Sequence, residues 1–304
     1  MAGLAVALRM RGETTRELAT AARVLRAHGA RVSLGLDEPV LDTCGTGGDG
    51  LSTFNISTVS AIVVAAAGVK VAKHGNRAVS SRAGSADVLE ALGVRLDLDL
   101  AAHRRCIDAL GITFLFAPAH HQALRHAAAV RRELGVRTFF NLLGPLANPA
   151  DASHQLLGVF DPDRVRQLAE VLGVLGVARA WVVHGEGGLD EIAPSGVTRV
   201  AMLEGGTVRE TTLTPDDFGV EPVPIEALAG GDARDNAEIA RRILAGDAFA
   251  PRRAVLLNAG AALCVAGVVE GPRQGARVVA ETIDSGKAEV LLERWVALTR
   301  ELSA

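Results

Sequence analysis

Glycines, hydroxyl groups and an amide side chain are concentrated between Gly45 and Thr58. The segment follows a strand candidate at 40–44, and four of its first six residues are glycine. Glycines let a backbone approach a ligand closely, and a helix that begins near Ser57 or Thr58 offers free N–H groups and the positive end of its dipole to an anion. A plain turn explains one or two glycines. The segment therefore predicts a phosphate-binding site.

The same glycines raise two alternatives. Gly45, Gly47 and Gly50 match the GxGxxG pattern of dinucleotide-binding folds. That pattern requires an acidic residue about twenty positions later, at the end of the second strand. Lys73 and His74 stand there instead, with the opposite charge. No Gly-Lys-Ser/Thr follows either, so the nucleotide-binding P-loop pattern is absent.

The second candidate segment runs from Lys73 to Ser81 and reads Lys-His-Gly-Asn-Arg-Ala-Val-Ser-Ser. It follows a strand candidate at 69–72 and carries two cations, a histidine and two hydroxyl groups. Ligands of parallel α/β sheets bind at the carboxyl ends of the strands. We therefore expect this segment to face the glycine loop and to bind a ligand with several phosphates.

The third candidate is the pair Asp190 and Glu191, in a glycine-rich loop after a strand at 181–183. Carboxylates are hard oxygen ligands, and Mg²⁺ bound to a pyrophosphate commonly takes one or two of them. Alone, such a pair is usually a surface turn. His120 and His121 are adjacent and lack a third ligand at useful spacing, so we expect no zinc.

These segments must be positioned by alternating strands and helices. Helices are expected at 15–27, 59–67, 86–92, 100–110, 120–134 and 232–244, with a further strand at 112–116 and another helix after Asp161-Pro162. This order predicts an α/β fold with a mostly parallel sheet covered on both faces. The last third is expected to be mainly helical. The purely helical start predicts a small helical domain at 1–34, completed by roughly 119–142, beside an α/β domain at 35–304.

Composition excludes some classes of protein. The 304 residues carry a net charge of −3, which offers no overall attraction to nucleic acid. The longest apolar stretch, Val59 to Val69, is too short to span a bilayer. Three widely spaced cysteines fit a reducing compartment. We expect a cytoplasmic protein without membrane or nucleic-acid partners.

Six motifs in order resemble the anthranilate phosphoribosyltransferase family over nearly the whole chain. They are Gly45–Asp49, Asn55–Thr58, Lys73–Ser81, Gly84–Gly93, Arg137–Pro149 and Asp190-Glu191. The resemblance implies a nucleoside phosphorylase/phosphoribosyltransferase-like fold. It also implies transfer of phosphoribosyl from phosphoribosyl pyrophosphate to anthranilate in tryptophan biosynthesis, with up to two Mg²⁺ ions and a homodimer.

The resemblance also implies site residues. Those for phosphoribosyl pyrophosphate are Gly45, Gly48, Asp49, Thr53, Asn55, Ile56, Ser57, Thr58, Lys73, His74, Gly75, Asn76, Arg77, Ala78, Val79, Ser80, Ser81 and Ser85. Those for anthranilate are Gly45, His74, Asn76, His121, Arg131 and Pro145. Ser57, Asp190 and Glu191 are implied as Mg²⁺ ligands, and Lys73, Arg77 and Asp49 as catalytic residues.

The chain departs from the family pattern in two places. The family has further helices before the segment that matches Met1, and those helices contribute to its dimer contact, so we expect a weakened homodimer. Gln122 stands where the family often has proline. Two rivals stay open: a pyrimidine nucleoside phosphorylase, which shares the glycine loop, and a non-catalytic nucleic-acid-binding relative.

Overall fold

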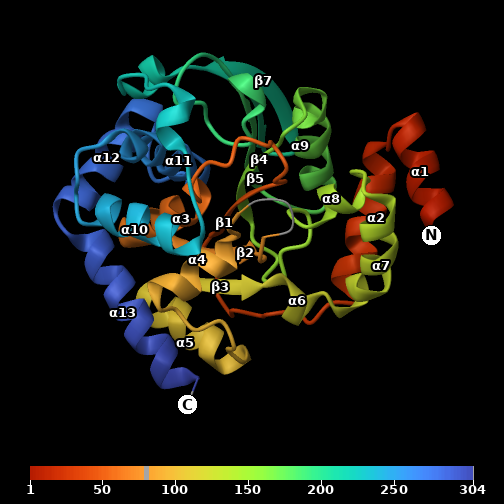
Figure 1. The fold of residues 1–304 in the computed structure, drawn as a ribbon, viewed down its shortest axis with the longest axis horizontal. Coiled ribbons are helices and arrows are strands. Elements are labelled where there is room, and N and C mark those ends of the chain that lie inside the picture. Colours follow the sequence, from red (N-terminus) through yellow and green to blue (C-terminus); the bar gives the residue numbers. More distant parts are fainter. Residues whose placement is uncertain (79–81, 304) are drawn as a thin grey trace.

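The computed structural model describes residues 1–78 and 82–303, and this part of the chain forms one seven-stranded sheet flanked by helices (Figure 1). The strands stand in the order β3-β2-β1-β4-β5-β6-β7. Neighbours from β3 to β5 are parallel, whereas the pairs β5–β6 and β6–β7 are antiparallel. The strands are β1 (Val40–Gly45), β2 (Lys70–Gly75), β3 (Ile112–Phe116), β4 (His154–Gly158), β5 (Arg179–Gly185), β6 (Thr198–Glu204) and β7 (Thr207–Leu213). The predicted α/β fold with a mostly parallel sheet is confirmed.

The last third is mainly helical, as expected, but the hairpin β6–β7 at its start was not predicted. Its turn is Gly205-Gly206, with φ of 56° and 76°, the backbone that a tight hairpin turn requires. β7 is an edge strand whose side chains are mostly exposed. Threonines and charged residues fill it, so it lacks the apolar alternation that marks a half-buried strand.

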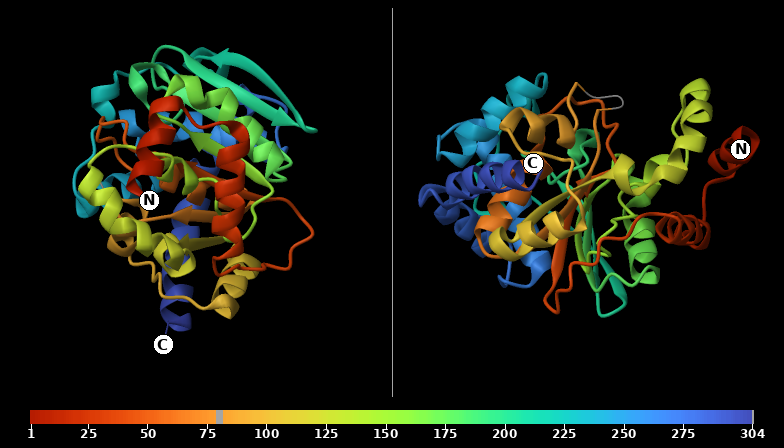
Figure 2. Two further views of the ribbon diagram at one scale, coloured as in Figure 1. Left: turned by 90° about the vertical axis from the view of Figure 1, so that its right-hand side faces the viewer. Right: turned by 90° about the horizontal axis from the view of Figure 1, so that it is seen from below.

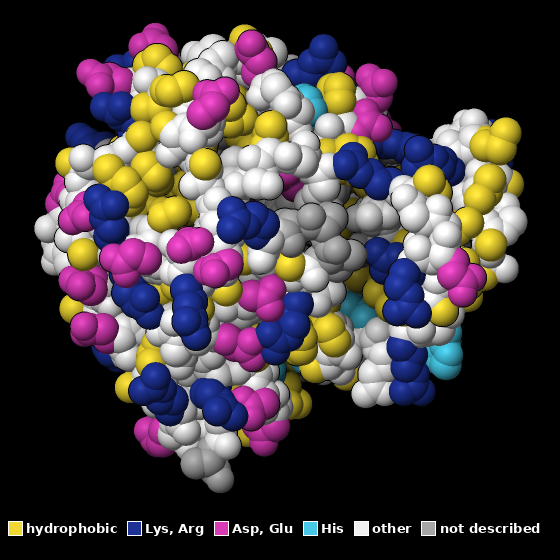
Figure 3. All heavy atoms as spheres, in the orientation of Figure 1, with side chains coloured by type: hydrophobic (Ala, Val, Ile, Leu, Met, Phe, Trp, Pro, Cys, Tyr) yellow, Lys and Arg dark blue, Asp and Glu magenta, His cyan; other side chains and the backbone are white. Residues whose placement is uncertain are grey.

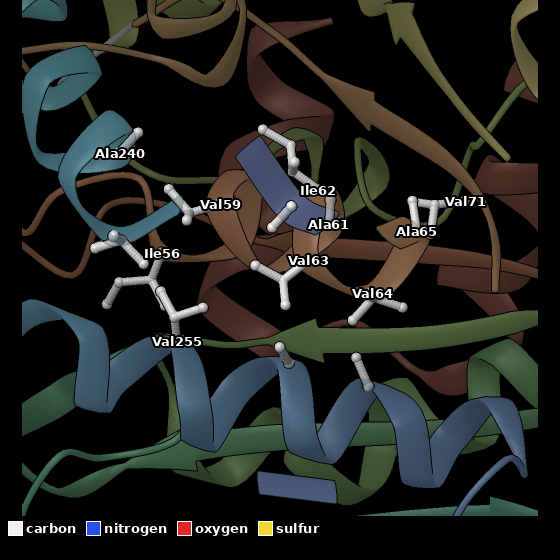
Figure 4. Close-up of a cluster of buried hydrophobic side chains, with 14 of the residues drawn as sticks. Ile56, Val59, Ala61, Ile62, Val63, Val64, Ala65, Val71, Ala240 and Val255 are labelled. Carbon is white, nitrogen blue, oxygen red and sulfur yellow. The ribbon is translucent and has the colours of Figure 1, made fainter. Parts of the chain in front are cut away.

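Helices cover both faces of the sheet. Helix α3 (Ile56–Ala66) is apolar all round and almost wholly buried. Figure 4 shows its side chains packed among Ala240 and Val255, which belong to α10 and α11. Burial of each valine or isoleucine contributes about 1.5–3 kcal/mol, so α3 is fixed firmly against the sheet. The other helices of this core are α4 (Ser85–Leu92), α5 (Leu100–Leu110), α10 (Ala233–Leu244), α11 (Ala250–Ala266), α12 (Pro272–Asp284) and α13 (Lys287–Leu302).

A second core cluster joins the sheet to a group of helices at one side of the molecule (Figures 1 and 2). Helix α9 (Val165–Val174) packs on the sheet, and α2 (Thr15–Ala27) packs on α9. Thr14 and Glu17 form a capping box that begins α2. The side group also contains α1 (Ala2–Arg11), α6 (Ala117–His120), α7 (Arg125–Leu134) and α8 (Phe140–Leu143). The division into domains at 1–34 and 35–304 stays a prediction.

Several predicted boundaries were wrong by a few residues. Helix α3 begins at Ile56 with Asn55 as N-cap, so Ser57 lies in its first turn and is not its cap. Strand β2 continues to Gly75, which places Lys73 and His74 inside the strand and not in the following loop. Gly84, and not Ser85, caps α4.

Two other helix predictions also need correction. The helix expected over 120–134 is interrupted at His121, and Gly135 ends its second part in the left-handed conformation that a helix C-terminus favours. Asp161 caps a short 3₁₀ turn before α9. None of the helices in the described part of the chain has the length and apolar character of a membrane span.

Candidate active site

The carboxyl ends of four parallel strands meet at one edge of the sheet. β1, β2, β4 and β5 each end in a glycine, namely Gly45, Gly75, Gly158 and Gly185. Because the strands run in the same direction, the loops that follow them lie together, which is where α/β sheets bind ligands. The three predicted segments follow β1, β2 and β5. The topology therefore brings them to one edge.

Asp190 is buried against the glycine loop. Its Oδ2 accepts a hydrogen bond of 2.7 Å from the Gly47 N–H. A Cβ on Gly45 would lie 2.4 Å from that same oxygen, and a Cβ on Gly158 would lie 1.5 Å from the Asp190 carbonyl oxygen. Both strand ends must therefore be glycine for this carboxylate to reach the loop. The glycine loop is therefore shaped around Asp190.

Glu191 and Lys73 meet at Ser57. The Ser57 N–H, in the first turn of α3, donates to Glu191 Oε1 at 3.1 Å. Lys73 Nζ donates to Ser57 Oγ at 3.3 Å and also to the Thr43 carbonyl oxygen. Lys73 is 2% exposed, so its ammonium group is held by β1 and α3 and faces inward. We call Asp49, Ser57, Lys73, Asp190 and Glu191 the strand-end cluster.

Burial and mutual repulsion raise the pKa values of the clustered carboxylates. Burial, followed by the charge of Asp49, raises the pKa of Asp190 to about 7. Burial and the charge of Asp190 also raise the pKa of Glu191, against the opposing effect of Lys73. A cation placed between these groups would relieve their repulsion and lower both pKa values.

The donor set suits Mg²⁺. Asp190 and Glu191 each use one oxygen for a backbone N–H, and as carboxylates they have a second oxygen for a hard cation. Within residues 1–78 and 82–303, no three His, Cys, Asp or Glu side chains are grouped closely enough to enclose a metal ion by themselves. Mg²⁺ usually retains waters and binds substrate phosphates, so one or two carboxylates suffice.

Arg77 points away from the strand-end cluster. Its guanidinium group donates to Asp87 Oδ1 at 3.1 Å and to Glu90 Oε1 at 2.8 Å, both on α4. Asp87 Oδ2 in turn accepts from the N–H groups of Ala78 and Gly84, each at 2.9 Å. These bonds tie both ends of the segment that joins β2 to α4. The predicted site residues Val79, Ser80 and Ser81 lie outside the described residues.

The residues around the start of α3 hold further contacts. Asn55 Nδ2 donates to the Ala83 carbonyl oxygen at 3.2 Å, and Asn55 Oδ1 accepts from Asn236 Nδ2 at 2.9 Å. Ser85 Oγ donates to the Asn76 carbonyl oxygen at 3.3 Å. Thr53 pairs with Ala229 as an isolated bridge. Of the remaining predicted residues, Ile56 and Thr58 are buried in the first turn of α3, Gly48 lies in the loop after β1, and Gly75 ends β2.

His74 and His121 lie together between the sheet and the side group of helices. Their ring centroids are 5.1 Å apart in an edge-to-face arrangement. His121 Nε2 pairs with the Ala147 carbonyl oxygen at 2.7 Å, so this nitrogen carries the proton. Burial, then the neighbouring His121, lowers the pKa of His74 to about 3. His74 Nε2 and His121 Nδ1 are buried without a hydrogen-bond partner, which leaves both available to an N–H donor.

Arg131 and Pro145 complete the predicted set on the helical side. The Arg131 guanidinium group, in the last turn of α7, lies 5.7 Å from the centre of the Phe140 ring. Pro145 offers its carbonyl oxygen to Gln155 Nε2 at 2.7 Å. Figure 3 shows Lys and Arg side chains along the part of the helical group that faces the rest of the molecule.

Two residues at this edge escaped the sequence prediction. Asp42 is fully buried in β1, and its Oδ1 accepts from the His74 N–H at 3.1 Å. Arg137 donates to the Gly48 carbonyl oxygen and lies 4.1 Å from the centre of the Phe160 ring. Asp42 is a charged residue inside the apolar run Val40–Cys44. The sequence could have indicated its importance, because a buried charge requires partners. Arg137 lies within the quoted motif, but nothing in its spacing indicates a contact with Gly48.

Comparison with known proteins places this geometry among transferases. The model of a glycosyl transferase family, a/b domain, matches residues 37–289. The chain is 58% identical over 286 residues to an anthranilate phosphoribosyltransferase of Myxococcus xanthus, a match that covers 94% of this chain and 84% of that protein. The crystal structure of the Thermus thermophilus anthranilate phosphoribosyltransferase superposes with a TM-score of 0.93 at 49% identity, covering 98% of this chain and 89% of that one. The Saccharomyces cerevisiae enzyme in complex with phosphoribosyl pyrophosphate and Mg gives a TM-score of 0.90 at 30% identity, over 99% of this chain and 85% of that one.

Proposed function

This chain belongs to the anthranilate phosphoribosyltransferase family, and from that premise we propose how its strand-end cluster acts on the substrates. The enzyme transfers the phosphoribosyl group from phosphoribosyl pyrophosphate to the amine of anthranilate, a step of tryptophan biosynthesis. One observation supports the assignment of residues. Lys73 and Glu191 both form hydrogen bonds with Ser57, and Asp190 accepts a hydrogen bond from the glycine loop.

The diphosphate is proposed to bind between the glycine loop, the start of α3 and the segment after β2. The N–H groups of the glycine loop beyond Gly47 donate to phosphate oxygens, and the positive end of the α3 dipole adds to the attraction. Lys73 adds a buried ammonium charge. We propose Arg77 as the second cation of this site. Its ion pairs with α4 hold the start of the segment after β2.

Mg²⁺ is proposed to bind the diphosphate through Asp190, Glu191 and Ser57, with up to two ions. Bound there, the metal neutralises negative charge on the leaving pyrophosphate. Asp49 belongs to the same group of charges, because it raises the pKa of both Asp190 and Glu191. The strand-end cluster has three acidic side chains and one lysine. Its charge is therefore balanced by cations, and a phosphate alone would not balance it.

Anthranilate is proposed to bind between the strand ends and the helical group. Arg131 pairs with its carboxylate, because a guanidinium group matches a carboxylate with two parallel hydrogen bonds. The unpartnered ring nitrogens of His74 and His121 accept N–H bonds at the entry. Gly45, Asn76 and Pro145 complete the lining.

Catalysis in this proposal is electrostatic and positional. The bond from ribose C1 to pyrophosphate breaks as the aniline nitrogen attacks, and that amine is un-ionised at neutral pH, so no strong base is required. Lys73 and the α3 N-terminus stabilise the charge that builds on the leaving group. Holding both substrates in line, with water excluded, provides the remaining rate enhancement.

Loss of anthranilate fluorescence tests the proposal. The signal should fall only when phosphoribosyl pyrophosphate and Mg²⁺ are both present, and Lys73→Met should slow the fall strongly. Thymidine or uridine with phosphate provides the control for a nucleoside phosphorylase. Release of a free base from them, with anthranilate fluorescence unchanged, would contradict the proposal.

We further propose a cytoplasmic homodimer. The exposed apolar side chains of α1, among them Leu4 at 61% and Met10 at 83% exposure, support a contact through this helix. Buried thiols at Cys44, Cys106 and Cys264 are consistent with a reducing compartment. Sedimentation velocity of the wild type and of Met10→Lys would test the dimer, because the charged residue should dissociate a contact made through α1.

A further inference from the structure

Three arginines surround a cavity at the opposite edge of the sheet from the strand-end cluster. Arg23, Arg26 and Arg31 line it together with Asp151 and the segment 175–177, and its volume is about 340 Å³. We call this the arginine pocket. Asp151 lies shortly before β4 begins, and 175–177 shortly before β5 begins. The predicted loop with Asp190 and Glu191 follows the other end of β5. At about 3.3 Å per residue, the five residues of β4 alone separate the two sites by about 15 Å.

The charges of the arginine pocket do not balance. Arg26 Nη1 lies 3.4 Å from Asp151 Oδ1, and Arg31 Nη1 lies 3.8 Å from Asp151 Oδ2. Two guanidinium groups therefore share one carboxylate, and with Arg23 the lining carries two positive charges in excess. Burial lowers the pKa of Arg26, and the nearby Arg31 acts in the same direction against Asp151. A second negative group in the cavity would relieve this repulsion.

Structural roles account for only part of this arrangement. Arg26 Nε donates to the Leu146 carbonyl oxygen at 2.9 Å, and Arg23 Nη2 donates to the Val174 carbonyl oxygen at 2.7 Å at the end of α9. These bonds use a minority of the N–H donors of each guanidinium group. Arg31 is 67% exposed and forms the longest of these ion pairs, so its solvated side chain gains little there.

We propose that the arginine pocket binds a small anion with two or more negative charges, such as a phosphate or diphosphate group. Arginine forms bidentate bonds with phosphate oxygens, and a cavity of this size admits a small phosphorylated molecule. The bound anion connects α2 to the segments before β4 and β5. It therefore stabilises the folded protein by RT ln(1 + [L]/Kd), where [L] is the free anion concentration. This inference does not depend on the proposed function of the strand-end cluster.

Titration calorimetry with inorganic phosphate at low ionic strength tests the proposal. Arg23→Gln with Arg31→Gln should weaken binding about ten-fold or more, because two charge-assisted contacts are lost. Asp151→Asn should tighten binding several-fold, because the competing carboxylate is removed. Asn tolerates the backbone at 151, where φ is 49°, as readily as Asp does.

Two control variants separate this pocket from other anion sites. Arg209→Gln removes an exposed charge on β7 and should leave phosphate binding unchanged. Lys73→Met removes the lysine of the strand-end cluster and should leave the pocket's binding event in place. The proposal is overturned if the wild type binds no phosphate, if Lys73→Met abolishes all binding, or if Asp151→Asn and the double arginine variant bind like the wild type. Asp151→Asn decides the question if the double variant does not fold.

Discussion

The two edges of the parallel strands collect opposite excess charge. At the carboxyl ends, Asp49, Asp190 and Glu191 surround Lys73, and the pKa of Asp190 is raised to about 7. At the amino ends, three arginines line a cavity that holds the single carboxylate Asp151, and two of them pair with it. The first edge is short of cations and the second is short of anions. The comparison supports our two proposals, in which the first edge binds Mg²⁺ together with a diphosphate and the second binds an anion without a metal.

The largest expected effect comes from the edge that holds the strand-end cluster, which we call the carboxylate edge. Asp190→Asn combined with Glu191→Gln keeps the shape of both side chains and removes their charge. We expect kcat/KM to fall by about 1000-fold at fixed Mg²⁺, which corresponds to about 4 kcal/mol of transition-state stabilisation. Initial rates from anthranilate fluorescence measure the change. Asp216→Asn with Glu221→Gln removes two charges elsewhere and should retain wild-type rates.

Close packing at the same edge gives the next effect. Gly158→Ala places a Cβ 1.5 Å from the Asp190 carbonyl oxygen, so the backbone must move. We expect the free energy of unfolding to fall by about 3 kcal/mol, with loss of activity. Urea denaturation followed by circular dichroism provides the value. A matched control is Gly271→Ala, where nothing lies within 4 Å of the added Cβ, and equal losses in the two variants would refute the packing argument.

A substitution at Arg131 tests whether anthranilate binds between the carboxylate edge and the helical group. Arg131→Ala should raise the KM for anthranilate by about 10- to 100-fold, because a bidentate pair with a carboxylate is lost. The KM for phosphoribosyl pyrophosphate should hardly change. Arg132→Ala, its exposed neighbour, serves as the control. A change confined to the KM of the phosphoribosyl donor would show that Arg131 does not contact anthranilate.

A buried histidine shows the smallest effect. His103 pairs with Thr113 Oγ1 at 2.9 Å, and burial lowers its pKa to about 4 from the usual 6.5. Since the folded pKa is the lower one, its contribution to stability is present above pH 6.5 and is lost as the pH falls toward 4. Between pH 7 and 5 we expect it to account for about 1–2 kcal/mol of the decrease in unfolding free energy. His103→Asn should show a smaller decrease over this range. An unchanged decrease would mean that His103 is not responsible.

Much of the carboxylate edge could be predicted from the sequence because its determinants are local. Gly45 to Thr58 combine a strand end, a glycine loop and a helix start in one continuous segment, and Asp190-Glu191 directly follows a strand. Parallel strands with covering helices then bring the segments together. The contacts of Ser57 with Lys73 and Glu191 agree with that reasoning.

Other features depend on contacts that no local pattern contains. Arg77 pairs with Asp87 and Glu90 of α4, contacts that the sequence did not indicate, and its role as a phosphate ligand stays a prediction. The arginine pocket combines residues from α2, the segment before β4 and the end of α9. Strand β7 was missed because an exposed edge strand has little apolar pattern.

The most direct test of the central claim is the Mg²⁺ dependence of phosphoribosyl pyrophosphate binding, measured by titration calorimetry in the wild type and in Asp190→Asn/Glu191→Gln. We expect Mg²⁺ to tighten binding strongly in the wild type and to have almost no effect in the double variant. Equal tightening by Mg²⁺ in both proteins would show that these carboxylates do not bind the metal-bound diphosphate, and would contradict the account given for this edge of the sheet.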